Sequence, residues 1–186
     1  IAVDKIFAGH GLQIFDVEEI PTHGGSLRIF TCHAEDETKS STLRLRQLWQ
    51  REIDAGLNTL AAYSHFAEQV KETKRKILAF LIQAKREGKK IIGYGAPGKR
   101  NTLLNDCGIR TDFLDFTVDK NPYKHYKFVP GTHIPIYPPE KMNDARPDYV
   151  FILPWNFKDE IMGQIAFIRD WNGKFVVPIP ELTVYP

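Results

Sequence analysis

The sequence is poor in cysteine, in net charge and in long apolar runs. Its two cysteines, Cys32 and Cys107, are too few for a disulfide framework or a cysteine-rich zinc site, and we interpret both as reduced. The net charge of +2 excludes a broadly basic surface for nucleic acid or a membrane. No stretch is long enough to span a membrane, and no signal peptide can be recognised. The sequence therefore predicts a cytoplasmic protein without nucleic-acid or membrane partners.

Compact metal-site and hydrolase motifs are also missing. None of the six histidines stands in an H-E-x-x-H motif or a similar ligand spacing, so we expect no metal. No Ser-His-Asp or Cys-His arrangement can be read from the spacing. His23, beside Gly24 and Gly25, could reach a cleft as an acid or base; the alternative is an ordinary loop histidine. We keep His23 as the candidate catalytic residue.

A glycine-rich stretch at residues 91–101, I-I-G-Y-G-A-P-G-K-R-N, is the most informative feature present. It predicts a buried strand, a G-x-G-x-x-G turn and the first turn of a helix. Glycine permits tight turns and close approach of a ligand, and the N–H groups at a helix start favour an anion such as a phosphate. We predict that this site consists of Gly93, Tyr94, Gly95, Ala96, Pro97, Gly98, Lys99, Arg100 and Asn101.

The context of the turn makes the pattern more specific. Asp119 lies 21 residues beyond Gly98, at the end of the next predicted strand. A glycine turn followed by such an acidic residue is typical of a dinucleotide-binding βαβ unit. An ordinary βα turn that binds nothing is the alternative, and Asp119 could equally be a turn or cap residue.

The first half of the chain reads as a hairpin followed by helices. Residues 12–19 and 26–33 alternate like two antiparallel strands, with Asp16 among the polar positions, and 35–41 form a polar linker. Helical character extends from about 42 to 86, broken at 56–58, with Asn58 as a helix cap. A stripe at spacings of three and four predicts packing in a core or a helix seam; its members are Leu60, Tyr63, Ala67, Val70, Ile77, Leu81 and Ala84.

From residue 89 onward, strands alternate with helices. We expect a strand that begins at Ile91, further strands at 113–119, 148–153 and 174–178, a helix at 157–170, and an extended tail from 180. Alternation with short connections predicts an α/β fold with a parallel, Rossmann-like sheet flanked by helices. The predicted division is a hairpin with linker (1–40), a helical segment (41–88) and the Rossmann-like domain (89–186).

Ligands of such sheets bind beyond the carboxyl ends of the strands. The loops at 93–100, 119–121 and 154–156 should therefore converge on one crevice. Asp119 could accept a hydrogen bond from a ribose, and Trp155 and the region of Tyr123 could stack on a ring. Lysines 120, 124 and 127 form a small basic patch that could attract a phosphate or be merely solvated. The further candidate binding residues are Lys120, Asn121 and Asn156.

Several motifs in this order resemble the C-terminal domain of the sugar C-methyltransferase family. The glycine stretch, from Gly93 to Asn105, carries the resemblance first. The further matches are D-K-N-P-Y-K (119–124), P-G-T-H-I-P (130–135), R-P-D-Y-V (146–150), L-P-W-N (153–156), V-P-I-P-E (177–181) and, ahead of them, H-G-G-S-L-R (23–28).

The resemblance implies a three-part enzyme that uses S-adenosylmethionine to methylate nucleotide-linked deoxysugars. The zinc-binding N-terminal region, the domain that binds S-adenosylmethionine and the Tyr/Glu/His segment of the catalytic base are absent from this sequence, which starts inside a domain and reads as a fragment. We expect the fragment itself to hold no cofactor. It should bind the nucleotide diphosphate sugar, with the pyrophosphate at the glycine turn, and should work together with the missing domains without methylating alone.

Two other functions fit parts of the pattern. The βαβ fingerprint alone would suit an NAD(P)-binding oxidoreductase module, although no Tyr-Lys pair or hydride-transfer site can be identified. A non-catalytic nucleotide-binding or docking domain is the second alternative, with the long helices serving as a partner or homodimer surface.

Overall fold

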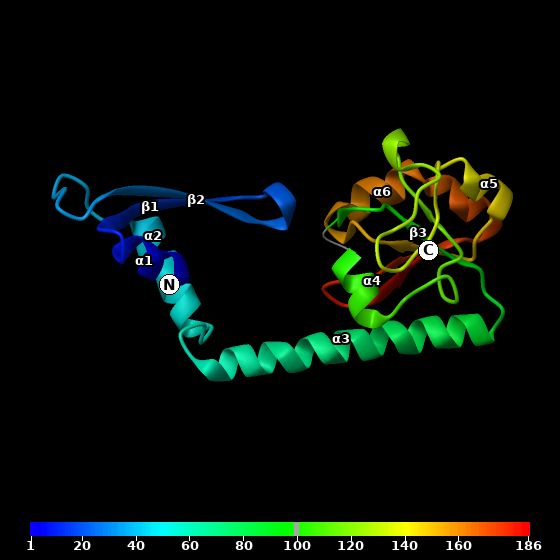
Figure 1. Cartoon of the computed structure of the whole chain (residues 1–186), viewed down its shortest axis with the longest axis horizontal. Helices are drawn as coiled ribbons and strands as arrows, with labels where there is room; N and C mark the ends of the chain where they lie inside the picture. The colour runs from blue at the N-terminus through cyan, green and yellow to red at the C-terminus, as the bar shows by residue number, and fades with distance from the viewer. Residues whose placement is uncertain (99–100) are drawn as a thin grey trace. The chain divides into compact units, whose positions relative to one another are not determined.

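The computed structural model describes residues 1–98 and 101–186, with the side chain of His23 left out. These residues form two compact units, Ile1–Gln69 and Val70–Pro186. The boundary falls within helix α3 (Leu60–Arg86), so this helix contributes residues to both units (Figure 1).

The first unit is an antiparallel hairpin with two helices, as the alternation in the sequence predicts. Strand β1 (Leu12–Ile20) pairs with β2 (Ser26–His33) across the short 3-10 turn η1 (Thr22–Gly24). Helix α1 (Ala2–Ala8) precedes the hairpin and α2 (Leu43–Asp54) follows it. The predicted linker at 35–41 is largely exposed.

Strand β1 contains an irregularity that simple alternation does not predict. Its pairing register with β2 shifts between Ile14 and Asp16, which is the signature of a β-bulge at Phe15. The consecutive residues Asp16 and Val17 are both buried as a result. Within the described part of the first unit they are the only residues that reach this degree of burial.

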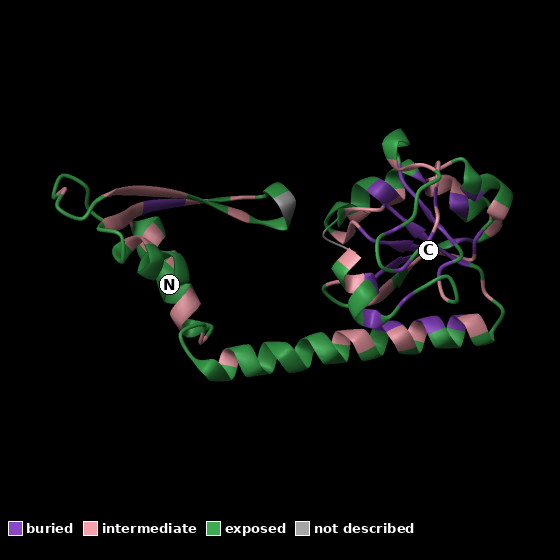
Figure 2. Ribbon diagram, viewed as in Figure 1, coloured by how far each residue is buried: buried purple, intermediate pink, exposed green. Residues whose placement is uncertain are grey.

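Helix α3 confirms the predicted core packing over only part of its length. Ile77, Leu81 and Ala84 are buried, whereas Leu60 is 85% exposed and Tyr63 is 56% exposed. Figure 2 shows the buried positions confined to the C-terminal part of the helix. The helix begins at Leu60, one residue later than a cap at Asn58 predicts.

The second unit alternates strands and helices around one sheet. After the C-terminal half of α3, its elements are β3 (Ile91–Tyr94), α4 (Asn101–Cys107), β4 (Thr117–Val118), η3 (Pro122–Lys124), β5 (Ile136–Tyr137), α5 (Lys141–Ala145), β6 (Tyr149–Ile152), η4 (Trp155–Phe157), α6 (Lys158–Gln164), η5 (Ala166–Trp171), β7 (Lys174–Val177) and β8 (Thr183–Tyr185).

The sheet has six strands in the order β5-β4-β3-β6-β7-β8. The first five are parallel, which confirms the Rossmann-like α/β class, and the order reverses at β3. The sixth strand is antiparallel to β7. The tail predicted to be extended from residue 180 does contain an extended strand, but the sequence did not predict that it turns back and pairs with the edge of the sheet.

Helices cover both faces of this sheet. One core lies between the sheet, α3 and α4, and contains Ile91, Phe151 and Leu81. The other lies beneath α5, α6 and η5, and contains Ile92 and Phe175. Figure 2 shows the strands as the most buried part of the unit. Neighbouring strand residues point to opposite faces, so a sheet covered twice explains the continuous apolar runs in the sequence.

Two predicted elements differ in extent. The strand expected at 113–119 is reduced to Thr117–Val118, because residues 111–113 form a turn that feeds the chain into the sheet. The helix expected at 157–170 is divided into α6 and η5 at Ile165. Its apolar side is nevertheless as predicted, since Ile161, Ile165 and Ile168 are all buried.

Candidate ligand site at the carboxyl edge of the sheet

The strand order brings the three predicted loops to one edge. Strands β4, β3 and β6 are neighbours, and the loops that follow them carry Asp119, Ala96 and Trp155 respectively on the same carboxyl side. Parallel strands end together, and β3 is the point where the order reverses. Crevices at such positions are the usual ligand sites of doubly wound sheets.

Asp119 joins the loop after β4 to the glycine turn. One of its carboxylate oxygens accepts hydrogen bonds from the N–H of Ala96 at 2.7 Å and from the ammonium of Lys124 at 2.9 Å. The other oxygen accepts from the N–H of Asn121 at 2.8 Å. The residue is only 8% exposed. A carboxylate has about four acceptor positions, so Asp119 retains room for roughly one more donor.

The charge of Asp119 is held at this edge by its partners. Burial alone would raise the pKa of the Asp119 carboxyl, but the hydrogen bonds from Lys124, Asn121 and Ala96 outweigh it and hold the pKa below its ordinary value. The group is therefore ionised near neutral pH. Of the two roles that the sequence left open for Asp119, these contacts bear out the turn role, and the binding role stays a prediction.

Two of the three glycines are required by close packing. A Cβ on Gly93 would lie 2.7 Å from the Thr117 hydroxyl oxygen. Gly95 has φ +86°, and a Cβ there would lie 2.7 Å from Cγ of Pro154, so this turn touches the loop after β6. Around Gly98, in contrast, no described atom lies within 4 Å of the Cβ position. Unlike Gly93 and Gly95, Gly98 is therefore not required by packing against the described residues.

The N–H groups at the start of the turn are already used inside the protein. Gly95 donates to the carbonyl of Val118 at 2.6 Å, and Ala96 donates to Asp119. These two N–H groups are therefore not free for a phosphate in this structure, and the predicted phosphate site of the whole turn stays a prediction. Helix α4 begins at Asn101 and has seven residues, so its dipole can contribute little. Lys99 and Arg100, which were predicted to add charge here, lie outside the described residues.

Tyr94 carries a buried hydroxyl at the end of β3. Its side chain belongs to the core under α5 and α6. No hydrogen-bond partner for its oxygen occurs among residues 1–98 and 101–186. Burial, and then the negative charges of Asp119 and Glu160, raise the pKa of Tyr94. Unpaired buried hydroxyls are uncommon and invite an explanation.

The remaining predicted residues occupy the loops on either side. Lys120 and Asn121 follow Asp119 directly and are exposed, and the Asn121 side chain caps η3 by accepting from the N–H of Tyr123 at 3.0 Å. Trp155 is half-buried against the α6 core, and Asn156 beside it is exposed. The backbone of His23 lies in η1 of the first unit, and its side chain lies outside the described atoms.

Sequence reasoning missed the roles of Lys124 and His125. Lys124 was predicted only as a member of a small basic patch that attracts a phosphate or is solvated, yet it forms an ion pair with Asp119. His125 Nε2 lies 2.7 Å from the Asp119 carbonyl oxygen, to which it can donate. A five- or six-residue spacing from an acidic strand-end residue is the one signal in the sequence that could have suggested these contacts.

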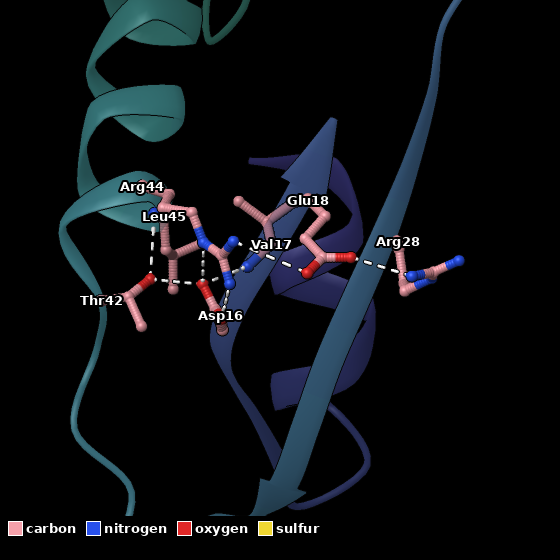
Figure 3. A network of polar contacts seen from close by, with 7 residues as sticks. All are labelled: Asp16, Val17, Glu18, Arg28, Thr42, Arg44 and Leu45. Atoms are coloured by element: carbon pink, nitrogen blue, oxygen red, sulfur yellow. Dashed lines mark hydrogen bonds and ion pairs between the residues drawn. The ribbon is translucent and has the colours of Figure 1, made fainter. Parts of the chain in front are cut away.

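A second polar cluster, in the first unit, was also missed. The Asp16 carboxylate accepts from the hydroxyl of Thr42 at 2.6 Å and from Nε of Arg44 at 2.9 Å, and its second oxygen pairs with the same guanidinium (Figure 3). These hydrogen bonds hold the pKa of Asp16 far below its ordinary value. Thr42 also caps α2, so the cluster fastens that helix to the hairpin. We assign it a structural role.

One hollow of the first unit is largely apolar. It measures about 280 Å³ and is lined by α1, the hairpin and α2, with Val17, Ile29 and Trp49 among its residues. None of the residues predicted to bind a ligand lines it. Across the described ranges there is neither a cluster of three potential metal ligands nor a helix long and apolar enough to span a membrane.

Fold and site together define an α/β domain of Rossmann-like topology with a polar edge at the strand-order reversal. Residues 21–180 match the family described as the C-methyltransferase C-terminal domain. The match covers most of the chain, and the protein therefore belongs to this family.

A curated relative agrees with this assignment. The C-methyltransferase NovU of Streptomyces niveus is 32% identical over 176 residues, which cover 95% of this chain and 42% of the relative. The chain thus spans less than half the length of that relative. A crystal structure of UDP-D-quinovosamine 4-dehydrogenase from Vibrio fischeri matches with 22% identity and a TM-score of 0.36, over 50% of this chain and 79% of that one. At that TM-score the likeness carries no weight for function.

Proposed function

We propose that this chain is part of a C-methyltransferase that uses S-adenosylmethionine, and that its second unit holds a nucleotide diphosphate sugar. The convergence of three loops on one edge carries the proposal: Asp119 joins two of them, and Gly95 touches Pro154 of the third. The family assignment supports the methyltransferase context. The whole protein would act in the cytoplasm and contain a zinc-binding region and a domain for S-adenosylmethionine.

The pyrophosphate would lie beyond the turn, over Gly98. No atom of the described residues lies within 4 Å of the Gly98 Cβ position, and Lys99 and Arg100 follow it directly in the sequence. Asp119 accepts a hydrogen bond from Ala96, two residues before Gly98, and its charge is balanced by Lys124. A doubly negative ligand approaching the edge would therefore meet a neutralised carboxylate and a cluster of cations, which favours binding.

The chemistry of the whole protein would proceed in two steps. A base would remove a proton from the carbon next to a sugar ketone, and S-adenosylmethionine would supply the methyl group to that carbon and leave as S-adenosylhomocysteine. The present residues would bind and orient the substrate, with His23 as the candidate for an acid–base role. Asp119, Lys120, Asn121, Trp155 and Asn156 are the side chains proposed to surround the ligand.

Two other functions follow from particular observations. An NAD(P)-binding oxidoreductase module would use Asp119 for a ribose, which the remaining acceptor position of its carboxylate allows. A docking role for α3 would use its exposed apolar residues, such as Leu60 and Phe66, which is 63% exposed. A homodimer through these helices would show as a mass that doubles with concentration in sedimentation.

Calorimetric titration of this chain with a thymidine diphosphate sugar, NAD and S-adenosylmethionine tests the proposal. We expect binding of the nucleotide sugar alone. Binding of NAD alone would favour the oxidoreductase module, and binding of none would contradict a ligand site complete within this chain.

Two glycine variants test whether the ligand lies over Gly98. Gly98→Leu adds a side chain to the open position, and Gly163→Leu adds the same group on α6, where the Cβ position is equally free of described atoms. Gly98→Leu should abolish nucleotide-sugar binding while the melting temperature stays near that of the matched control. Equal affinities for both variants would remove Gly98 from the site.

A further inference from the structure

A short loop beside the candidate site exposes three aromatic rings. This aromatic loop, residues 122–128, alternates rings with lysines and follows Asn121 directly. Tyr123 is 82% exposed, Tyr126 is 75% exposed and Phe128 is 63% exposed. Large aromatic side chains usually lie inside a protein or at an interface. Three exposed rings within six residues therefore indicate a surface that contacts something else.

The aromatic loop is fixed to the ligand edge on two sides. Lys124 and His125 bind the carboxylate and the carbonyl of Asp119. On the other side the N–H of Tyr126 donates to the carbonyl of Ile136 at 2.8 Å, and Lys127 accepts from the N–H of Ile136 at 2.9 Å. The loop therefore continues the sheet beyond β5, and its rings are held by backbone bonds that do not involve them.

Tyr126 has a backbone conformation that disfavours a bulky side chain. Its φ is +63°, in the left-handed region where glycine and asparagine are favoured and a bulky side chain is an outlier. Within the described residues its ring contacts are edge contacts, with centroids 6.1 Å from Tyr137 and 6.3 Å from His125. The side chain thus gains little burial at a position that would favour glycine, and folding gives no reason for a tyrosine.

The strand order indicates which part of a ligand these rings would contact. The turn after β3 takes the phosphates, β4 and β5 lie on one side of it, and β6 with Trp155 lies on the other. From β3 to β5 the lateral distance is about 10 Å, which is two strand spacings. A nucleoside attached to the pyrophosphate can span that distance, so the two ends of the ligand would occupy opposite sides of the turn.

We propose that the aromatic loop binds the nucleobase of the ligand, by stacking on Tyr123 and Tyr126, and that the sugar lies on the Trp155 side. The inference rests on the proposed function and adds the orientation of the ligand in the site. Stacking on an aromatic ring is worth enough per base to change affinity by about tenfold or more. Lys120 and Lys127, both exposed, would attract the phosphates without fixing the base.

Three variants separate this role from folding. Tyr126→Asn replaces the ring with a residue that suits the left-handed backbone, and Tyr123→Ala removes the other ring. Phe128→Ala is the matched control, because Phe128 belongs to the same loop but bridges to Pro135, away from the carboxyl edge. Each is titrated with thymidine diphosphate and with inorganic pyrophosphate, and its thermal unfolding is measured.

We expect Tyr126→Asn and Tyr123→Ala each to weaken thymidine diphosphate binding about tenfold and to leave pyrophosphate binding within twofold. The melting temperature of Tyr126→Asn should not fall, and Phe128→Ala should bind both ligands normally. Unchanged thymidine diphosphate affinity in both tyrosine variants, or an equal loss for both ligands, would overturn the inference while leaving the site itself intact. Absence of thymidine diphosphate binding by the unmodified chain would instead reject the proposed function.

Discussion

Single residues decide whether the three loops of the candidate site can meet. Gly95 combines a positive φ with a contact that leaves no space for a side chain, because the Pro154 ring lies 2.7 Å from its Cβ position. Gly98, four residues after β3, has neither constraint. The G-x-G-x-x-G pattern predicted the turn but did not distinguish the roles of its three glycines. The distinction depends on Pro154, which is distant in the sequence.

Replacing Gly95 by alanine should lower the free energy of unfolding by about 2 to 4 kcal/mol, from left-handed strain together with overpacking. Gly98→Ala, the control, should change it by no more than about 0.5 kcal/mol. Denaturant unfolding of both variants measures the difference. Equal stabilities would mean that the turn after β3 does not pack on Pro154.

Asp119 gives the edge a pH dependence whose direction follows from its environment. Its pKa in the folded protein is lowered, whereas in the unfolded chain it is about 3.9. The ionised carboxylate therefore stabilises the fold above pH 4, and this contribution is lost as the pH falls below about 4.

Asp119→Asn should cost about 1 to 3 kcal/mol at pH 7, because charged hydrogen bonds to Ala96 and Lys124 are lost. The difference from the unmodified protein should shrink below about pH 4. Asp115→Asn is the matched control: Asp115 pairs with Lys85 at 2.8 Å but is exposed, so its loss should cost at most about 1 kcal/mol. A difference for Asp119→Asn that grows towards low pH would contradict the assigned state of the carboxylate.

At the scale of elements, helix α3 shows what periodicity can and cannot predict. Its stripe correctly marks the face that packs, because apolar residues at spacings of three and four share one side. Periodicity does not say where the packing partner ends. Leu81 is fully buried and Leu60 is 85% exposed, although both occupy the same stripe.

The two leucines make a matched pair. Leu81→Ala should destabilise the second unit by about 2 to 5 kcal/mol through lost burial and a cavity. Leu60→Ala should change stability by no more than about 0.5 kcal/mol. Urea unfolding followed by circular dichroism measures both. A large cost at Leu60 would show that the exposed end of the stripe is covered in solution.

The edge strand β8 and the bulge in β1 are the elements that the sequence did not predict. Pairing of β8 with β7 depends on a reversal of the chain between Val177 and Thr183, which no local pattern encodes. The bulge buries Asp16 against Thr42 and Arg44, from a different part of the first unit. The bulge thus depends on a contact distant in sequence that overrides the local pattern, whereas β8 pairs across a short connection.

For the whole molecule, the buried residues are unequally divided between the two units. Both large cores lie within residues 70–186, whereas Asp16 and Val17 are the buried residues described in the first unit. The second unit can therefore bury its apolar surface without the first. The division predicted from the sequence, at residues 40 and 88, stays a separate proposal about the architecture of the full protein.

Residues 70–186 produced alone should fold and melt cooperatively, because their core is complete. Residues 1–69 alone should show little cooperative unfolding. Thermal melts followed by near-ultraviolet circular dichroism compare the two. A 70–186 fragment without fixed aromatic signals would show that the second unit depends on the first.

The central claim is that the carboxyl edge of the sheet holds a nucleoside diphosphate. Titration of the isotope-labelled chain with thymidine diphosphate, followed by amide and indole NMR shifts, tests it most directly. The claim predicts saturable shifts at Ala96, Gly98, Asp119 and Tyr126 and at the Trp155 indole, with the hairpin β1–β2 unchanged. Shifts confined to residues 1–69, or no shifts at millimolar ligand, would contradict it.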